Sequence, residues 1–389
     1  MQIKQMKAGL LLTMMVAASA VLLQACQKDE VGVPGGGSDD GPSAAQVRNL
    51  RQFEELTVNI GALVSEVRSR GASAINVRLE GGTARDLEVM VKAAEPDAQL
   101  FVDDVPQPMP EIFTLTGFRR GTSEPCVITL AEGWFSAVFK ENGEDYFVQA
   151  RKDFDPAAGD DQFVIYRAQD VIDPGPTMCG SDATDGISIP EHDEVEQGDR
   201  STCKKVKMTV VADPQFRDDY SSNANCLAAM TTQINNASYC YWHNTTLLLD
   251  MTVSKNYIYT SSSSFTSSVS STLLGQLRTW GNASSSRRSD LNYLFTGKDL
   301  ESNVVGRGYL GVACYNPTYA YAIGMKMSTT AYWRNLIAHE TGHNFNASHA
   351  TSGIMLDHVT NANSFNSTSK TAIQSFTNAH NCYTTGTCN

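Results

Sequence analysis

His339-Glu340-Thr341-Gly342-His343, followed by Asn344-Phe345-Asn346-Ala347-Ser348-His349, is the stretch that decides how this chain folds. On a helix, His339 and His343 are one turn apart, so both imidazoles leave the same face. One Zn²⁺ ion can take a nitrogen from each, while the Glu340 carboxylate lies beside the metal. His349 cannot come from the same straight helix face, so the chain must break and turn back to bring it to the metal. The alternative interpretation is three histidines on a solvated helix and loop.

Three neutral imidazoles leave a fourth position on zinc for a water molecule, whose pKa can fall to about 7. We expect Glu340 to accept the proton of this water as it attacks a peptide carbonyl, and then to deliver the proton to the leaving amine. The residues alone therefore predict a zinc hydrolase with its general base in place.

The start of the chain has the pattern of an export signal. Two lysines precede an apolar run that ends in Leu23-Gln24-Ala25-Cys26. This tetrapeptide resembles a bacterial lipobox, which predicts cleavage before Cys26 and a lipid on that cysteine; an ordinary signal peptide cut at an Ala site is the alternative. We expect a lipoprotein signal peptide over residues 1–25, a flexible tether over residues 26–44, and a location at the bacterial outer membrane or cell surface.

Length and composition indicate a globular protein with two modules. The chain has 389 residues, of which 41% are hydrophobic and 19% charged. From Ser201 onward lie 13 of the 30 Lys and Arg and 9 of the 42 Asp and Glu, a net charge of +4, which leaves −16 before that point. An acidic front and a mildly basic rear suit mutual docking. Because no basic stripe appears, nucleic-acid binding is not predicted. We expect the protein to be a monomer.

The front module, residues 45–200 with its linker, is predicted to be rich in β-strands. A helical pattern covers Ala45–Arg70, and alternating apolar residues predict strands at 135–139, 145–150 and 162–167. Glu141-Asn142-Gly143 has the composition of a hairpin turn. The polar stretch His192–Lys205 is either a linker cut by a protease near Arg200–Lys205 or a plain interdomain loop.

The rear module, residues 201–389, alternates strand and helix patterns. The expected strands are 205–212, 247–259, 291–295, 309–314 and 322–327, and the expected helices are 223–241, 269–280, 330–345 and 369–380. This alternation predicts an α/β fold, with a mainly parallel sheet and helices on its faces.

The rear module resembles the metzincin zinc endopeptidases, and within them the adamalysin (reprolysin or ADAM-like) branch. The resemblance rests on Val210-Val211-Ala212-Asp213, on Leu291–Leu300 leading into Gly308–Cys314, and on the zinc helix with Ser352-Gly353-Ile354-Met355. It implies a metzincin catalytic domain with a twisted, mainly parallel five-stranded sheet, an active-site helix and a C-terminal helix. A β-rich propeptide domain would precede it, since Gly133–Val171 is similar to adamalysin propeptides.

The resemblance also implies roles for single residues. Met355 would be the Met-turn residue, which lies beneath the metal site and does not bind zinc. A strand at the rim of the cleft would pair with an extended substrate, which adds as an antiparallel strand. The residues of this strand would be Gly308, Tyr309, Leu310, Gly311 and Val312. The alternative is that they form an interior strand of the sheet. Two positions depart from the family pattern. Asn346 stands where the family usually has Gly, because the helix ends there with the backbone at positive φ; after Gly, Asn tolerates this conformation best. Ala350 stands where the family commonly has Asp.

Pro176-Thr177-Met178-Cys179-Gly180 resembles the cysteine switch of adamalysin propeptides. The resemblance implies that Cys179 ligates zinc in the zymogen, in the position of the water. A Cys126–Cys179 disulfide is the alternative, and Asp182, Asp185 and Asp193 are further candidates for blocking zinc. Six later cysteines allow 15 pairings into three disulfides, which stay open. Adamalysins often bind Ca²⁺, but Lys207 stands where an acidic residue is expected, so Ca²⁺ is not predicted.

The sequence therefore predicts a zinc-dependent endopeptidase that cleaves extended segments of proteins or peptides and is made as a latent lipoprotein precursor. A cut near Arg200 would both unblock the zinc and free the catalytic module from the lipid at Cys26. The alternative from another class is a surface-binding lipoprotein or adhesin with an inactive metzincin fold. Glu340 argues against that alternative, because a binding module has no use for this carboxylate. A toxin that cleaves host surface proteins would use the same chemistry.

Overall fold

The computed structural model of the chain describes residues 47, 49–71, 73–175, 177–181, 202–242, 247–380, 382–386 and 388. These residues all belong to one structural unit, residues 45–389. The predicted signal peptide, the tether with Cys26 and most of the predicted linker, including Asp193 and Arg200, lie outside the described residues, as do Asp182 and Asp185.

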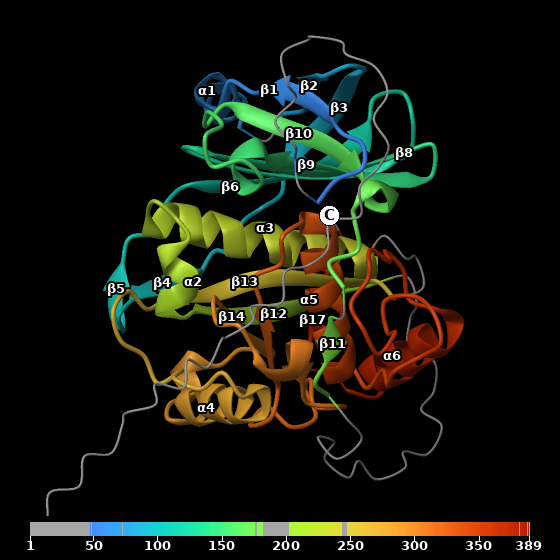
Figure 1. The fold of residues 1–389 in the computed structure, drawn as a ribbon. Helices are drawn as coiled ribbons and strands as arrows, with labels where there is room; N and C mark the ends of the chain where they lie inside the picture. Colours follow the sequence, from blue (N-terminus) through green and yellow to red (C-terminus); the bar gives the residue numbers. More distant parts are fainter. Residues whose placement is uncertain are drawn as a thin grey trace, which may run out of the picture. The chain divides into compact units, whose positions relative to one another are not determined.

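An antiparallel sheet of eight strands forms the front module (Figure 1), in the order β1-β10-β9-β8-β7-β6-β3-β2. The strands are β1 Glu54–Thr57, β2 Ile75–Glu80, β3 Ala84–Val91, β6 Ile112–Arg119, β7 Pro125–Ala131, β8 Trp134–Glu141, β9 Glu144–Ala150 and β10 Gln162–Arg167. The three strands predicted here are confirmed as β8, β9 and β10. Asn142 and Gly143 form the predicted hairpin turn between β8 and β9, and both have positive φ, as a type I′ turn requires.

The expected helix over Ala45–Arg70 is wrong in its first half. The helix α1 covers only Ile60–Arg70, where the Asn59 side chain accepts a hydrogen bond from the N–H of Ala62 and caps its start. The preceding β1 pairs with β10 and buries Leu56 in the core of the sheet. Pairing and burial across the sheet are tertiary gains that a local helical pattern does not reveal.

A second sheet forms the rear module, in the order β11-β15-β16-β14-β12-β13-β4-β5, with β17 beside β12. Its rear-module strands are β12 Cys203–Ala212, β13 Leu249–Ile258, β14 Leu291–Thr296, β15 Val304–Gly308, β16 Tyr321–Met325 and β17 Thr384–Gly386. Strands β12, β13, β14 and β16 are parallel, and β15 runs antiparallel to β16. The predicted α/β fold with a mainly parallel five-stranded sheet, β12 to β16, is therefore confirmed.

Three strands of this second sheet come from the front module. β4 (Gln99–Val102) pairs in parallel with β13, and β5 (Val105–Gln107) pairs with β4. At the opposite edge, β11 (Met178–Cys179) pairs in parallel with β15. The front module thus covers both edges of the rear sheet, which no pattern in the sequence predicted.

Helices cover both faces of the second sheet. α3 (Asn223–Trp242) and α5 (Thr330–Asn344) pack on one face, and α4 (Ser270–Asn282) packs on the other, as Figure 1 shows. The further helices are α2 Pro214–Asp218 and α6 Ser367–Ala379, with short 3-10 helices at Arg151–Asp153, Ala168–Asp170, Ser285–Arg287 and Glu301–Asn303. The other face of α3 contacts β7 and β8, so this helix is covered by both modules. One hydrophobic core therefore joins the two modules.

The predicted strand Tyr309–Cys314 is a loop. β15 ends at Gly308, and the backbone N–H groups that follow donate to the carbonyl oxygens of His343 and Asn344; the donors are Gly311, Val312 and Ala313. Carbonyl groups in the last turn of a helix have no partner within the helix. The loop caps α5 instead of pairing as a strand.

Disulfides join Cys203 to Cys388 and Cys314 to Cys382. The other described cysteines are free thiols, namely Cys126, Cys179, Cys226 and Cys240. The alternative disulfide between Cys126 and Cys179 is therefore not formed. Cys226 and Cys240 both lie on α3. Their separation along a helix is roughly 21 Å, which excludes a bond between them.

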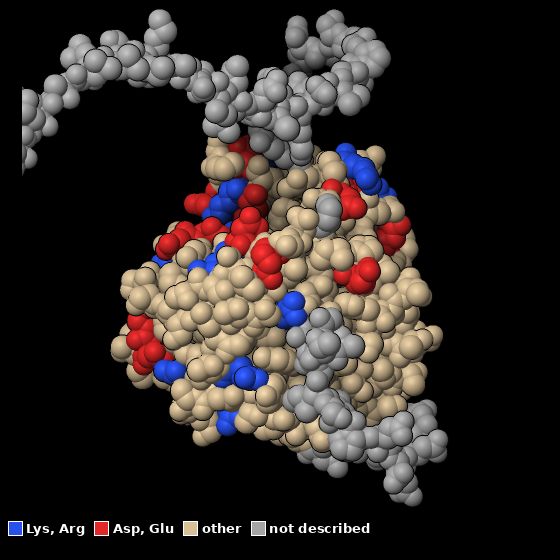
Figure 2. Space-filling view, turned by 60° about the horizontal axis from the view of Figure 1, so that its bottom comes forward, with Lys and Arg blue, Asp and Glu red and all other residues tan. Residues whose placement is uncertain are grey.

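Among the described residues, one ion pair between the modules runs against the predicted division of charge, Lys92 with Asp250 at 2.6 Å, and three follow it. Glu95 pairs with Lys207 at 2.6 Å, Asp104 with Arg287 at 3.1 Å, and Asp145 with Arg334 at 2.6 Å. In each of these three pairs the acid belongs to the front module. On the face that Figure 2 shows, Lys and Arg side chains are scattered among acidic ones rather than gathered in a stripe. Within the described ranges, no helix is both long and apolar enough to cross a membrane.

Candidate metal centre

α5 places His339 and His343 side by side, with their Nε2 atoms 3.1 Å apart. The other ring nitrogen of each faces a backbone carbonyl: Nδ1 of His339 lies 2.7 Å from the oxygen of Ile354, and Nδ1 of His343 lies 2.7 Å from that of Ala347. A carbonyl oxygen only accepts hydrogen bonds, so Nδ1 carries the proton in both rings. Two Nε2 lone pairs then face each other, an arrangement that favours a cation between them.

The chain breaks after His343 and returns His349 to the same place, as the sequence predicted. Asn346 has a φ of 68°. The N–H groups of Asn346 and Ala347 donate to the carbonyls of His343 and Gly342, at 2.8 and 2.9 Å. This is a Schellman cap with Asn in the position of the usual Gly. The ring of His349 lies with its centroid 5.3 Å from that of His339 and 4.9 Å from that of His343.

Cys179 completes a set of four metal-ligating side chains. The ligand atoms of Cys179, His339, His343 and His349 lie within 4.8 Å of one another, and Cys179 Sγ is 3.5 Å from His343 Nε2. A tetrahedral zinc ion with bonds of about 2.0–2.1 Å to nitrogen and about 2.3 Å to sulfur needs about 3.4 Å between two nitrogens and about 3.6 Å between nitrogen and sulfur. The observed 3.1 and 3.5 Å fit one such ion.

Burial sets the protonation of these side chains. It lowers the pKa of His339 to about 4, and it also lowers the pKa of His343 and of His349. All three rings are therefore neutral at pH 7, the form that binds metals. Burial and the nearby Glu340 carboxylate raise the pKa of the Cys179 thiol well above its usual value. A metal cation acts in the opposite direction, because it stabilises the thiolate.

Glu340 is fully buried beside the histidines. Its Oε2 lies 3.7 Å from Cys179 Sγ and 3.4 Å from Ser181 Oγ. Glycines in β15 make room for it: a Cβ on Gly306 would lie 2.7 Å from Glu340 Oε1, and a Cβ on Gly308 would lie 2.6 Å from the Glu340 carbonyl oxygen. The strand and the helix can approach this closely only because these two positions lack side chains.

Met355 is fully buried against the same turn of α5. A Cβ on Gly342 would lie only 2.6 Å from the Met355 sulfur. The carbonyl of Met355 also accepts a hydrogen bond from the N–H of Ala350, at 2.6 Å. Met355 therefore supports the helix between His339 and His343, and its backbone closes the loop that carries His349.

Comparison with known proteins agrees with this geometry. Residues 202–388 match the sequence profile of a reprolysin group described as metallo-peptidase family M12. The chain carries an M12 metallopeptidase domain. Since its three histidines come together and its glutamate is intact, this M12 domain is that of an enzyme.

The structure is similar to the crystal structure of metalloproteinase-II from Bacteroides fragilis, with a TM-score of 0.50 and 12% sequence identity. The match covers 80% of this chain and 93% of that one, so it includes the front module as well as the M12 domain. At this identity the similarity concerns the fold. A search of curated protein sequences found no match.

A segment of the front module fills the groove that runs past the histidines of the M12 domain. On one side, Cys179 pairs with Gly306 of β15, and the N–H of Gly180 donates to the Gly306 carbonyl at 2.8 Å. On the other side, the N–H of Cys179 donates to the carbonyl of Asp357 at 3.1 Å, and the N–H of Val359 donates to the carbonyl of Thr177 at 2.8 Å. The groove is therefore bounded by β15 and by residues 357–359.

The sequence located this groove only in part. Of the predicted rim residues, Gly308 ends β15, and the others lie in the loop that caps α5, namely Tyr309, Leu310, Gly311 and Val312. The strand that borders β11 is Val304–Gly308, and the two close-approach glycines there were the available signal. Ser181 was not predicted, although its Oγ donates to the Gly308 carbonyl at 2.9 Å and accepts from the Gly308 N–H at 2.8 Å.

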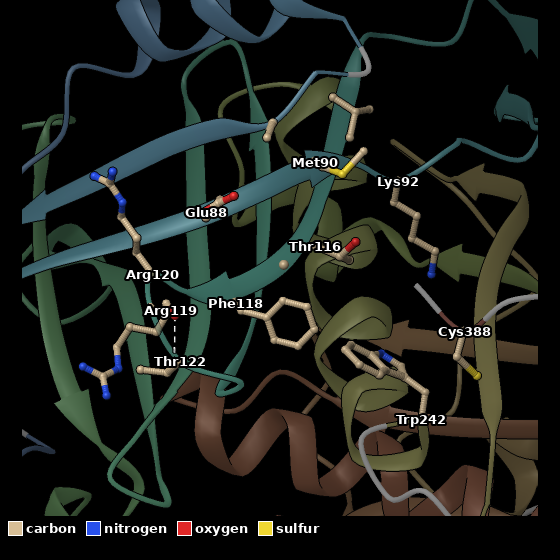
Figure 3. A pocket seen from close by; sticks show the side chains of 14 residues that line it. Glu88, Met90, Lys92, Thr116, Phe118, Arg119, Arg120, Thr122, Trp242 and Cys388 are labelled. Atoms are coloured by element: carbon tan, nitrogen blue, oxygen red, sulfur yellow. Dashed lines mark hydrogen bonds between the residues drawn. The ribbon is translucent and has the colours of Figure 1, made fainter.

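An open cavity of about 610 Å³ lies elsewhere, between β3 and β6 of the front module and the end of α3 (Figure 3). Met90, Phe118 and Trp242 are among the side chains around it. Among the residues that the structure describes, its lining includes no histidine, and its cysteine, Cys388, is in a disulfide. Within the described part of the chain, this cavity therefore has no cluster of metal-ligating side chains, whereas the groove at the candidate metal centre is occupied by β11.

Proposed function

We propose that this chain is a zinc-dependent endopeptidase of the adamalysin type, made as a latent lipoprotein precursor. Three neutral imidazoles meeting beside the buried carboxylate of Glu340, in an M12 domain, are the observation that carries this proposal. The substrates are extended segments of proteins or peptides.

The chemistry divides between the metal and the protein. When bound by His339, His343 and His349, zinc polarises a peptide carbonyl and lowers the pKa of water to about 7. Glu340 takes the proton of the attacking water and delivers it to the leaving amine. The carbonyls of Ile354 and Ala347 hold His339 and His343 in the tautomer that presents Nε2.

β15 binds the substrate. Once β11 leaves, the backbone groups of β15 that it covers become available to an extended peptide, which adds as an antiparallel strand. β11 itself runs parallel to β15. In the precursor the groove is thus filled by a segment whose direction is opposite to that of a substrate.

Cys179 supports latency. Its sulfur lies 3.5 Å from His343 Nε2, so Cys179 would be the fourth side chain to hold a zinc ion, and its thiolate would then exclude water from the metal. Hydrogen bonds to both walls of the groove hold this segment in place. Removing Cys179 from the metal therefore requires withdrawal of the whole strand.

We place the activating cut at Arg200, ahead of the paired lysines. Lys204 and Lys205 belong to β12, which corrects the expectation that the linker extends to Lys205. Lys204 Nζ donates to the carbonyl of Thr377 at 2.7 Å, and Lys205 Nζ pairs with Asp250 at 2.5 Å. A protease needs an extended, accessible segment, which β12 does not offer.

The lipid at Cys26 places the precursor at the outer membrane or cell surface. The cut at Arg200 ends the covalent link to the lipid, and the M12 domain is released as a monomer when the front module, which shares its core, dissociates. Cofactors other than zinc are not part of the proposal. Lys207, at the position where a Ca²⁺ ligand is expected, forms its ion pair with Glu95 at 2.6 Å. Nucleic acid is not a partner, because the charge of the rear module is small.

The decisive experiment uses the full chain after limited proteolysis of its linker. The wild-type protein and Glu340→Ala are each incubated with a mixed proteome, with and without a zinc chelator, and new peptide ends are identified by mass spectrometry. We expect many zinc-dependent cleavages by the wild type, and a loss of at least about a thousandfold in the variant, because the general base is gone. The variant should keep one zinc per chain. Equal cleavage by both proteins would contradict the assigned role of Glu340.

A further inference from the structure

Arg307 carries the only side chain in Gly306-Arg307-Gly308, the part of β15 that borders the groove. Gly306 and Gly308 face α5, where an added Cβ would collide with Glu340. Successive side chains alternate across a strand, so Arg307 leaves the opposite face. There it meets α4.

A chain of hydrogen bonds orients the guanidinium of Arg307. Its Nε donates to Ser270 Oγ at 3.1 Å. Ser270 is fully buried and is itself held by Glu301, whose carboxylate accepts from the Ser270 N–H at 2.7 Å and from its hydroxyl at 2.8 Å. This bond to α4 therefore holds the guanidinium in one direction.

This guanidinium lies over the groove, directly at Gly180. A Cβ built on Gly180 would be 2.9 Å from Arg307 Nε and 3.0 Å from Nη2. Gly180 follows Cys179, whose sulfur stands at the metal centre. An extended peptide advances about 3.3 Å per residue. A side chain at this place in a bound peptide thus belongs to a residue within two positions of the reacting bond.

We propose that Arg307 is a specificity-determining residue that binds an acidic side chain of the substrate. A carboxylate placed here meets a preoriented guanidinium, and such charge-assisted hydrogen bonds are about twice as strong as neutral ones. A lysine or arginine in the same place is repelled. This inference rests on the proposed function, because it requires an extended peptide in the groove that β11 fills.

The test compares peptides that differ in one residue. The full chain, loaded with zinc and cut at the linker, is given a set of quenched fluorescent peptides in which each of the two positions on either side of the cleaved bond is in turn Glu, Gln or Lys. Wild type, Arg307→Gln and Arg307→Glu are compared, with Lys370→Gln on α6 as the control for loss of one positive charge.

For the wild type we expect kcat/KM to favour Glu over Gln by about tenfold to a hundredfold at one position, through KM as well as kcat. Arg307→Gln should lose this preference, Arg307→Glu should turn it towards Lys, and Lys370→Gln should keep it. A uniform loss on all peptides would make Arg307 a structural residue and overturn the inference. So would an acidic preference that survives in Arg307→Gln. If wild type cleaves no peptide at all, the proposed function fails rather than the assignment of Arg307.

Discussion

At the scale of single residues, Asn346 shows how one backbone conformation completes the candidate metal centre. Its φ of 68° ends α5 and turns the chain, so that His349 returns to the two histidines of the helix. A residue with a Cβ is strained in this conformation, and Asn tolerates it better than most. The sequence showed that the helix must end between His343 and His349, and that Asn346 stands where related sequences usually have Gly.

Substitutions of Asn346 test this strain. We expect Asn346→Ala to lower the free energy of unfolding by about 1 kcal/mol, whereas Asn346→Gly leaves it unchanged or slightly higher. Urea denaturation of the zinc-loaded protein measures both, and zinc affinity should fall with Ala. The Ala and Gly variants serve as controls for each other, because both remove the Asn side chain and only Gly accepts positive φ without strain. Equal stability of the two variants would refute the role of positive φ at this position.

The histidines also give the metal-free protein a pH dependence. The pKa of His339 is lowered from 6.5 to about 4 in the folded state. An unfolded chain binds this proton already below about pH 6.5, so stability is full above that pH and is lost as the pH falls towards 4. For this buried ring the loss is on the order of 3 kcal/mol.

Denaturant unfolding of the chelated protein between pH 8 and pH 4.5 measures this loss. His339→Gln should reduce the pH dependence but not abolish it, because the pKa values of His343 and His349 are also lowered, whereas His380→Gln should leave it unchanged. An unchanged slope in His339→Gln would show that the acid sensitivity has another origin.

At the scale of elements, β11 is the shortest described strand of the rear sheet, and it carries Cys179 to the candidate metal centre. It consists of Met178 and Cys179, and its neighbours Gly180 and Ser181 continue the contacts along β15. The Pro-x-Met-Cys-Gly pattern pointed to Cys179, but only the fold shows a strand held between β15 and residues 357–359.

Removal of the thiol should separate the two contributions to latency. In the uncut full chain, Cys179→Ala should cleave a small peptide slowly, because the metal is free while the backbone bonds of β11 remain. Cys126→Ala, which removes another free and buried thiol, should stay silent. Replacement of zinc by cobalt provides a second readout, since the thiolate-to-cobalt absorption of the uncut wild type should disappear in Cys179→Ala only. Persistence of that band would assign the fourth ligand to another residue.

At the scale of the whole molecule, the front module is part of the core around α5. Arg334 of α5 and Asp145 of β9 form an ion pair in which both side chains are buried, and Asn363 also donates to Asp145, at 3.0 Å. Burial alone would raise the pKa of Asp145, but the charge of Arg334 and its hydrogen bond hold it below the usual value. A buried pair of this kind contributes little net stability, whereas loss of one partner is costly.

Asp145→Ala should therefore lower the unfolding free energy of the full chain by about 3–5 kcal/mol, because Arg334 stays buried without its carboxylate. The double variant Asp145→Ala with Arg334→Met should recover most of this loss. Asp160→Ala removes the exposed pair with Lys152 and should cost at most about 1 kcal/mol. Denaturation midpoints measure all three. An Asp145→Ala protein as stable as Asp160→Ala would show that the charge of Arg334 reaches solvent.

Much of this protein could be read from local patterns. The helices α3 to α6 and the strands β8 to β10, β12 to β14 and β16 lie within about three residues of their predicted positions, because each carries its own apolar periodicity. His339, Glu340, His343 and His349 were predicted together, since the spacing of metal ligands on a helix is a local property. The errors occur at Glu54–Thr57 and Tyr309–Cys314, where a distant strand and the end of α5 supplied hydrogen-bond partners.

The sequence by itself predicted the meeting of the three histidines beside Glu340 and the mainly parallel sheet, because turns of helix and alternation of strands are set by neighbours along the chain. Only the tertiary structure decided which strand borders the groove, that the front module supplies both edge strands of the rear sheet, and that Arg307 overhangs Gly180. Those features depend on pairs of residues more than a hundred positions apart. They arise because sheet edges require hydrogen-bond partners and buried charges require opposite charges, and no local sequence pattern specifies those partners.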